Sequence, residues 1–355
     1  MLKSFRYLLF PFSLIYGACI LLRNFLFDKK VFKSSSFNFP IICVGNLATG
    51  GTGKTPMVEY LVGLLKDLYK PATLSRGYKR KTKGFAIAGE RTTAIEIGDE
   101  PMQFHEKFPG VTVAVGEERL VAIPQLLQDR PATDVIILDD AFQHRSVKAG
   151  LNIILTEYKN LYSRDLMMPA GDLRDVKASR VRADIIIVSK CRSDLNEKEK
   201  NAIIKELRLF PYQKIFFTEI LYAQPYHLFS KKKSSFGLGT DLLLISGIAN
   251  PKPLKEFLNT HVRSYDMLRY PDHHIFTSTD LKDIKKHFKR IHRENKMILT
   301  TEKDGVRLSK FEAELSDMPV YVLPMQHHFL FNEESAFNKI VVDFIESFKK
   351  TDGGD

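Results

Sequence analysis

The sequence predicts an α/β fold: a largely parallel sheet flanked by helices, with a smaller α/β domain after it and an apolar helix before it. Three observations support this prediction. Short β-rich runs alternate with helical stretches between residues 40 and 218. A polar segment rich in Lys, Ser and Gly, residues 231–239, interrupts the alternation, and a shorter series of strands and helices follows. Residues 7–22 carry no charge.

The apolar N-terminal segment is the first element. As a helix, its sixteen uncharged residues would be ~24 Å long, shorter than the ~30 Å hydrocarbon core of a bilayer. Arg6 and Arg23 flank the segment, and Pro11 starts or kinks a helix within it. We predict that residues 1–34 form a membrane-associating region whose helix lies in or dips into one leaflet. A signal peptide and a helix buried against the protein are the alternatives.

A glycine-rich loop, GNLATGGTGKTP at residues 45–56, follows the apolar run 40–44 and precedes an apolar helix. This strand, loop and helix order is that of a phosphate-binding P-loop. Ala48 stands where the strict pattern has glycine, so the loop is a variant, and an ordinary glycine-rich turn is the alternative. Lys54 would contact the β- and γ-phosphates and the Thr55 hydroxyl would bind Mg²⁺. The residues predicted to surround the phosphates of ATP are Gly50, Gly51, Thr52, Gly53, Lys54 and Thr55.

An apolar strand ending in two acids, DVIILDD at residues 134–140, supplies the second half of such a site. Asp139 or Asp140 would bind Mg²⁺ through water. A capped strand end is the alternative for the acids taken alone. The acids and the glycine-rich loop together predict a nucleotide-binding P-loop core.

The remaining elements divide the chain into three regions. Strands expected at 111–115, 152–155, 184–188 and 214–218 complete a core at residues 35–222. Residues 223–355 are expected to form the smaller C-terminal α/β domain, with the return of its last helices to the core as a second possibility. Its expected strands are 242–245, 297–299 and 320–323, and its expected helices are 253–259, 280–290 and 336–349.

Charge and cysteine content limit the function. With 53 Lys and Arg against 42 Asp and Glu, the net charge of +11 predicts an anionic partner: nucleic acid, phospholipid or a phosphorylated substrate. The three cysteines have no spacing typical of disulfides or zinc sites. A reducing, cytosolic setting fits this cysteine usage.

Two further segments carry candidate catalytic groups. In GDEP, residues 98–101, Asp99 would accept a proton from an attacking hydroxyl, or would cap a helix that has Pro101 in its first turn. In DHH, residues 272–274, His273 and His274 would bind a metal, or a single histidine would orient a carboxylate base. These residues alone do not decide between the alternatives.

Seven motifs in order resemble one family, the tetraacyldisaccharide 4'-kinases of lipid A biosynthesis. Ala48 and Ala141 depart from the family pattern, and the stretch after about residue 309 matches least. The motifs are GNLATGGTGKTP (45–56), SRGY (75–78), GDEP (98–101), DDAFQHR (139–145), PAGDLR (169–174), DHH (272–274) and TTEKD (300–304).

The resemblance implies a reaction and a set of roles. ATP and Mg²⁺ would phosphorylate the 4'-hydroxyl of a tetraacylated glucosamine disaccharide 1-phosphate, giving the 1,4'-bisphosphate. Asp99 would be the catalytic base, paired with His273, and Lys54 would neutralise the phosphates. The metal ligands would be Thr55, Glu100, Asp139 and Asp140, and the substrate-binding residues Arg76, Tyr78, Arg119, Gln143 and Arg174. Without the resemblance, each arginine would be interpreted as a surface salt-bridge partner.

The resemblance also implies a location: the cytoplasmic face of the bacterial inner membrane, against an anionic surface. No nucleic-acid or protein partner is expected. The competing function is a membrane-associated switch ATPase or GTPase that acts as a binding module. Thr49 replaces the signature lysine of the partition ATPases, and Arg192 replaces the acid that reads guanine in GTPases, so neither switch class is favoured.

Overall fold

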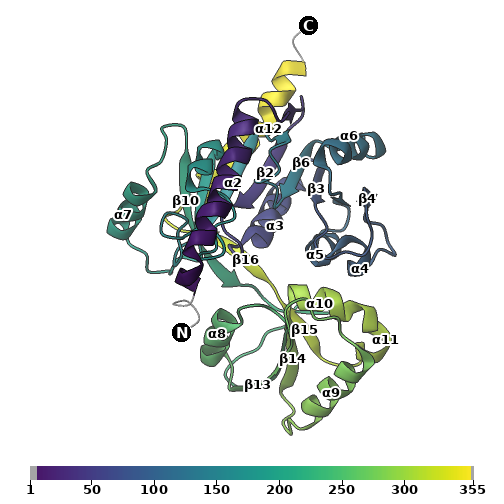
Figure 1. Ribbon diagram of the computed structural model, residues 1–355. Coiled ribbons are helices and arrows are strands. Elements are labelled where there is room, and N and C mark those ends of the chain that lie inside the picture. The colour runs from purple at the N-terminus through teal and green to yellow at the C-terminus, as the bar shows by residue number, and fades with distance from the viewer. Residues whose placement is uncertain (1–5, 353–355) are drawn as a thin grey trace.

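The computed structural model describes residues 6–352 of the chain, with side chains as far as residue 348. Two α/β units are visible, a larger and a smaller one, and helix α2 lies across the larger unit (Figure 1). The predicted fold class is confirmed: both sheets are mainly parallel and are flanked by helices.

The larger unit contains a nine-stranded sheet in the order β16-β10-β9-β8-β2-β6-β3-β5-β4. The two outermost strands, β16 and β4, run antiparallel to their neighbours, and the remaining pairs are parallel. The strands are β2 (Ile41–Asn46), β3 (Pro71–Ser75), β4 (Ala86–Ile87), β5 (Thr112–Val115), β6 (Val135–Asp139), β8 (Leu151–Glu157), β9 (Ile185–Ser189), β10 (Lys214–Tyr222) and β16 (Met325–Phe329). A short parallel pair, β1 (Ser35–Ser36) and β7 (Val147–Lys148), lies outside this sheet.

Helices cover both faces of the larger sheet. Strands β2, β6 and β9 are buried at every residue, as expected for parallel strands covered on both sides. One apolar cluster includes residues of α3, α5 and α12, and a second includes residues of α6 and α7. The helices of this unit are α3 (Lys54–Leu65), α4 (Ala94–Ile97), α5 (Asp99–Lys107), α6 (Arg119–Asp129), η2 (Lys177–Arg182), α7 (Glu197–Leu207) and α12 (Glu334–Asp352).

The smaller unit contains a five-stranded sheet in the order β11-β15-β14-β12-β13, parallel except for β11. Its strands are β11 (Tyr226–His227), β12 (Asp241–Ser246), β13 (Ser264–Arg269), β14 (Lys296–Thr301) and β15 (Val320–Leu323). Its helices are α8 (Lys252–His261), α9 (Ser278–Lys289), α10 (Glu302–Leu308), η3 (Ser309–Phe311) and α11 (Glu312–Leu315).

The chain returns to the larger unit at its end. Strand β16 pairs with β10, and Phe337, Val341 and Ile345 of α12 join the same apolar cluster as α3. We therefore propose that the larger domain combines residues 35–222 with 325–352 and that the smaller one is inserted between them. The expected strands lie near observed ones. Strands β3, β13 and β16 are not expected from the sequence, because they are short or carry polar residues.

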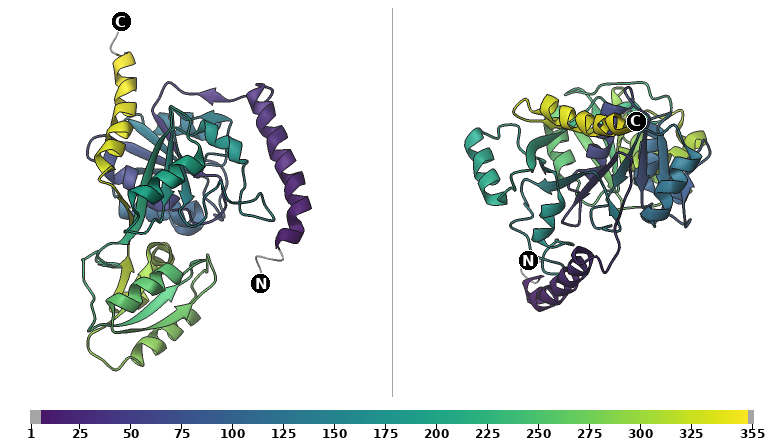
Figure 2. Two further views of the ribbon diagram at one scale, coloured as in Figure 1. Left: turned by 90° about the vertical axis from the view of Figure 1, so that its left-hand side faces the viewer. Right: turned by 90° about the horizontal axis from the view of Figure 1, so that it is seen from above.

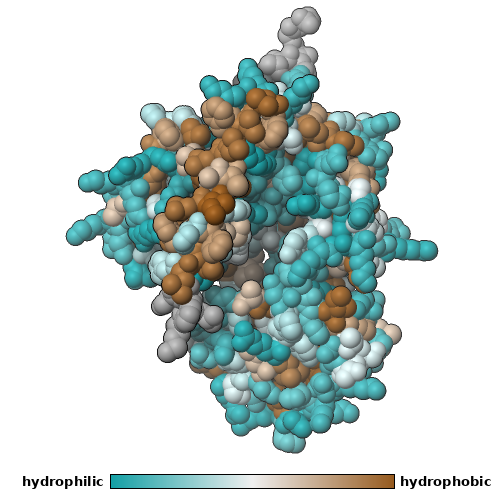
Figure 3. Space-filling model, in the orientation of Figure 1, coloured by the Kyte–Doolittle hydropathy of each residue, from teal (hydrophilic) through white to brown (hydrophobic). Residues whose placement is uncertain are grey.

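The N-terminal helix presents its small and polar residues to the protein. After the short η1 (Tyr7–Leu9), α2 (Phe10–Asp28) buries only Ser13, Gly17 and Asn24. Its large apolar residues are exposed, and Figure 3 shows them as a hydrophobic stripe along the helix. Figure 2 shows α2 at the periphery, outside the layers of the sheet. Within the described residues, Tyr7–Asp28 is the one helix long and apolar enough to cross a membrane.

Candidate active site

The predicted site residues gather where the strands of the larger sheet end. The glycine-rich loop follows β2, Asp139 ends β6, and Arg76 follows β3. In an open parallel sheet the carboxyl ends of the strands form the ligand-binding edge. The loop and helix that follow β13 and β14 of the smaller unit reach this edge through contacts with α5.

The glycine-rich loop has the backbone of a phosphate site. Gly50 and Gly53 have φ angles of 101° and 89°, in the left-handed region that glycine adopts without steric cost. Helix α3 begins at Lys54, so the free amides of its first turn lie at the loop. Asn46 donates to the Thr52 hydroxyl at 2.9 Å, and Ser189 donates to the Thr52 carbonyl at 2.7 Å. These bonds fix the loop from inside.

A histidine that the sequence analysis missed also fixes this loop. His327 of β16 lies 2.9 Å from the Gly53 carbonyl through Nε2 and 2.9 Å from the Thr218 hydroxyl through Nδ1. Burial lowers the pKa of His327 to about 4, so the ring is neutral near pH 7. A neutral ring with its proton on Nε2 donates to Gly53 and accepts from Thr218.

Lys54 faces the acids at the end of β6. Its ammonium lies 3.7 Å from Asp140, and burial lowers the pKa of Lys54. Arg174 contacts both carboxylate oxygens of Asp140 and also donates to the Asn46 amide oxygen at 2.5 Å. Burial favours the neutral carboxyl of Asp140, but Lys54 and Arg174 outweigh it and the net pKa is lowered. Asp140 is therefore an ionised carboxylate between two cations.

Asp139 has the opposite electrostatic environment. Burial, followed by the neighbouring Asp140 and to a lesser extent Glu100, raises the pKa of Asp139 to about 7, although Lys54 opposes the shift. The Ser75 hydroxyl, 3.4 Å away, is its hydrogen-bond donor. Glu100 itself pairs with Lys303 at 3.3 Å. Among the described residues, no three His, Cys, Asp or Glu side chains are grouped as a metal site.

Asp99 is the first residue of α5, but it does not cap the helix. Gly98 occupies the N-cap position without a side-chain cap. The Asp99 carboxylate instead accepts from His273 Nδ1 at 2.8 Å and from Arg307 Nη2 at 2.6 Å, both at Oδ2. Burial favours the neutral acid, but Arg307 and His273 outweigh it and the net pKa of Asp99 is lowered. Asp99 is thus an ionised, half-buried carboxylate contacted from the smaller unit.

The two adjacent histidines have separate partners, which argues against a metal-binding pair. His273, with φ of 63°, turns toward Asp99, and Lys303 lies 3.1 Å from its Nε2. His274 lies 3.0 Å from Asp280 and stacks on Tyr270. Of the two histidines, only His273 contacts the candidate base Asp99.

The five residues expected to bind substrate lie in different environments. Arg76 and Tyr78 are exposed, and the Tyr78 ring centroid is 5.6 Å from that of His273. Gln143 donates to the Asn46 carbonyl at 2.7 Å, while its buried Oε1 has no hydrogen-bond partner among the residues that the structure describes. Arg174, as described above, contacts Asp140.

Arg119 is not an exposed contact. Its side chain is buried, with 1% of the residue exposed, and it donates to the Gly116 carbonyl. Burial lowers its pKa to about 10. Its Nε and Nη2 have no hydrogen-bond partner within the described chain. The interpretation as a surface salt-bridge partner is therefore wrong for this arginine.

Helix α2 is bonded to the loops that carry two of these residues. Tyr16 donates to the Arg174 carbonyl at 3.1 Å, and Arg23 donates to the Gln143 carbonyl at 2.8 Å. Buried Asn24 donates to Asp175 at 3.0 Å. The helix that the sequence analysis assigned to the membrane is therefore also attached to the site.

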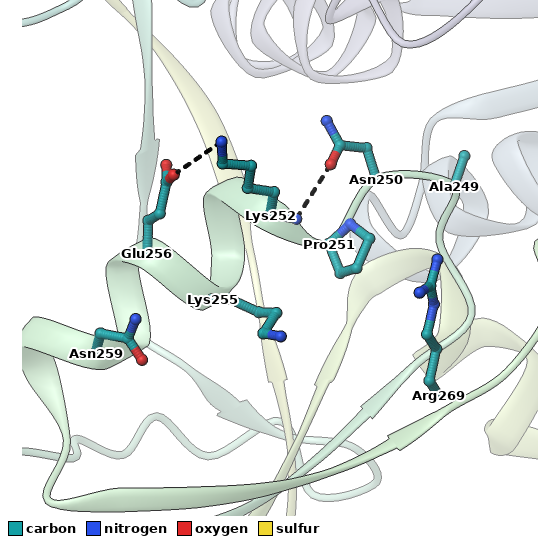
Figure 4. A pocket seen from close by; sticks show the side chains of 8 residues that line it. All are labelled: Ala249, Asn250, Pro251, Lys252, Lys255, Glu256, Asn259 and Arg269. Carbon is teal, nitrogen blue, oxygen red and sulfur yellow. Dashed lines mark hydrogen bonds and ion pairs between the residues drawn. The ribbon is translucent and has the colours of Figure 1, made fainter. Parts of the chain in front are cut away.

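A hollow of about 450 Å³ lies beside the site in the smaller unit. Figure 4 shows Lys252, Lys255 and Arg269 around it, with Lys252 turned toward Glu256. Lys255 and Arg269 form no ion pair within the described part of the chain. A neighbouring hollow shares Arg269 and extends to Asp272, next to His273.

Comparisons with known proteins identify the family of this chain. A family model described as tetraacyldisaccharide-1-P 4'-kinase matches residues 5–346. Tetraacyldisaccharide 4'-kinases of Bacteroides thetaiotaomicron and Flavobacterium johnsoniae are 43% and 44% identical, over 95% and 96% of this chain and 92% and 97% of theirs. The "apo" form of LpxK from Aquifex aeolicus in complex with ATP matches with a TM-score of 0.73 and 28% identity, over 97% of this chain and 100% of that chain. The chain therefore belongs to the tetraacyldisaccharide 4'-kinase family.

Proposed function

We propose that this protein transfers the γ-phosphate of ATP to the 4'-hydroxyl of a tetraacylated glucosamine disaccharide 1-phosphate, in lipid A biosynthesis. The observation that carries the proposal is a phosphate loop paired with an acid on the nucleotide side and an ionised carboxylate held by its own set of contacts on the other side. Lys54 lies 3.7 Å from Asp140, Lys303 joins Glu100 to His273, and His273 contacts Asp99. A switch ATPase needs no acceptor base of this kind, so the competing function is not favoured.

Asp99 accepts the acceptor's proton as the new O–P bond forms and the bond to the leaving ADP oxygen breaks. Its lowered pKa makes it a weak base, but phosphoryl transfer depends chiefly on positioning and charge neutralisation. Lys54 and the loop amides neutralise the phosphates on the nucleotide side. Arg76, Arg119 and Arg174 are guanidinium groups suited to phosphate oxygens.

The acids near Lys54 fit Mg²⁺. Asp139 and Asp140 are adjacent carboxylates; burial first, and then the charge of Asp140, raises the pKa of Asp139 to about 7, and a bound dication would favour its ionised form. Thr55, Glu100, Asp139 and Asp140 provide the hard oxygen ligands that Mg²⁺ prefers, and kinase sites use few protein ligands beside the phosphates. When bound, the ion would neutralise the charge of the transferred phosphoryl group.

We further propose that α2 inserts its exposed stripe into the cytoplasmic leaflet of the inner membrane. Leu14, Ile15 and Leu21 are more than half exposed, whereas the buried positions are small or polar. This is the reverse of a helix that packs its apolar face against its own core. A net charge of +11 favours an anionic surface. ATP, the phosphate donor, is a cytosolic compound.

The acceptor already carries a phosphate, and the basic hollow in Figure 4 suits it. Arg269 and Lys255 supply charge without competing carboxylates in contact. We expect Lys255→Glu combined with Arg269→Ala to raise KM about tenfold for the 1-phosphorylated acceptor. The same variant should not change KM for an acceptor lacking that phosphate; an equal effect on both acceptors would exclude this assignment.

The proposed activity is tested by transfer of labelled γ-phosphate to a detergent-dispersed tetraacyldisaccharide 1-phosphate, with Lys54→Ala alongside. We expect label at the 4' position of the lipid with the wild type and almost none with the variant. Lys66→Ala, a change at an exposed lysine just after α3, should behave as the wild type. Label released only as free phosphate, regardless of lipid, would favour the switch ATPase instead.

A further inference from the structure

Helix α10 of the smaller unit places two cations beside Asp99. Lys303 and Arg307 are four residues apart, so they lie on the same face of the helix. Lys303 contacts Glu100 and His273, while Arg307 contacts Asp99. The motif TTEKD, residues 300–304, is part of the family resemblance, but the sequence indicates no role for its residues or for Arg307.

We propose that Arg307 is a positioning residue that fixes the Asp99 carboxylate in one orientation. The proposal rests on the proposed function of Asp99 as the base. Arg307 Nη2 donates to Asp99 Oδ2 at 2.6 Å, and the arginine side chain is only 6% exposed. A buried, charge-assisted hydrogen bond of this length is among the stronger side-chain contacts.

Arg307 is itself fixed by a buried acid. Its Nη1 donates to Asp304 Oδ1 at 3.0 Å, and the Asp304 side chain is completely buried. The other Asp304 oxygen accepts from the Gly247 amide at 2.9 Å and the Thr301 hydroxyl at 2.8 Å. Asp304 therefore holds Nη1 of the guanidinium near the start of α10, and Nη2 reaches Asp99 of α5.

The same contacts leave one oxygen of the base available. Asp99 Oδ2 accepts from both His273 and Arg307, whereas Oδ1 has no hydrogen-bond donor among the described residues. We assign Oδ1 as the atom that accepts the acceptor's proton. His273 and Arg307 hold Oδ2 from two directions, so they restrict rotation of the carboxylate. Oδ1 is therefore oriented before the substrate binds.

Both ring nitrogens of His273 have neighbours in this arrangement. Lys303 Nζ lies 3.1 Å from Nε2, and Nδ1 lies 2.8 Å from Asp99 Oδ2 and 3.3 Å from Arg307 Nη2. The charged and titratable groups around Asp99 are Glu100 of α5, Asp272 and His273 of the loop after β13, and Lys303, Asp304 and Arg307 of α10.

The test compares Arg307→Gln and Arg307→Lys with the wild type in lipid phosphorylation. Glutamine retains a donor for Asp304 but removes the charge and the second nitrogen that holds Asp99, so kcat should fall about 100-fold with little change in the KM for ATP. Lysine restores the charge but not the fork of two nitrogens, so kcat of Arg307→Lys should recover only in part.

The matched control is Lys310→Gln, which removes an exposed cation three residues further along and should leave kcat and the KM for ATP unchanged. Melting temperature and ATP binding show whether each variant is folded. Arg307→Gln with wild-type kcat, or with a KM for ATP that rises in proportion to the loss of kcat, would overturn the proposal. Wild-type protein that transfers no phosphate to lipid would instead overturn the proposed function, so the two failures are distinguishable.

Discussion

The nucleotide half and the acceptor half of the site are built in different ways. The glycine-rich loop, Lys54 and the two acids of β6 all come from the larger sheet, and buried bonds fix them there. Asp99 lies on α5 of the same unit, but both of its partners, His273 and Arg307, come from the smaller one. The first half is complete within one unit, whereas the proposed base is complete only when both units are in contact.

Because of this difference, we expect ATP binding and phosphate transfer to depend on different residues. Damage to the contacts of Asp99 should reduce phosphate transfer without affecting ATP binding. Damage to the loop should reduce ATP binding first. A substitution in one half should therefore change either ATP affinity or the rate of phosphate transfer, and not both equally.

The largest effect is expected for Asp99→Asn. The amide has nearly the shape of the carboxylate but cannot accept the proton, so kcat should fall by about 10³-fold. ATP affinity, measured by calorimetry, should stay within about twofold of the wild type. Asp67→Asn, at an exposed position, is the control. A marked loss of ATP affinity would transfer Asp99 to the metal site and remove the distinction between the halves.

A smaller effect is expected for His327→Gln. This change weakens the bond to the Gly53 carbonyl, which is worth about 1 kcal/mol, so KM for ATP should rise about fivefold with a lesser change in kcat. His328→Gln is a matched control, because the neighbouring side chain is 51% exposed and pairs with Glu219. Equal effects of the two substitutions would mean that β16 supports the fold in general and not the loop.

The α2 helix should respond differently from both halves. Replacing Leu14, Ile15 and Leu21 with glutamine removes apolar area from its exposed stripe, so binding to anionic phospholipid vesicles should weaken by at least about tenfold. Phosphorylation of a detergent-dispersed acceptor should change by less than about twofold. Leu68→Gln, an exposed leucine after α3, is the control. Unchanged sedimentation with vesicles would exclude the membrane assignment of this face.

The two halves also differ in how far the sequence could predict them. Loop residues 50–55 are contiguous, and the strand and helix around them are evident in the pattern, so the nucleotide half could be predicted from local spacing. Asp99 and His273 were joined only by family resemblance, because nothing in their own segments distinguishes a helix cap or a metal ligand from a base. Cores of both sheets followed from apolar runs, which is why the fold class was predictable.

Residues that act from a distance were missed. His327 reaches Gly53 from an edge strand 274 positions away, and no periodic signal links the two. Arg307 had a weak signal, the four-residue spacing from Lys303 on one helix face, but the partner of that face could not be inferred. The resemblance implies that Arg119 contacts substrate, and its burial has no sequence signal because arginine is usually exposed; only the packing of α6 shows it.

The most direct measurement is a paired one on His273→Gln: the dissociation constant of a non-hydrolysable ATP analogue and the single-turnover rate of phosphate transfer to lipid. We expect the dissociation constant to remain within about twofold of the wild type while the transfer rate falls about 100-fold. That result would establish that the smaller unit completes the base without contributing to nucleotide binding. A dissociation constant that rises in proportion to the loss of rate would contradict the account.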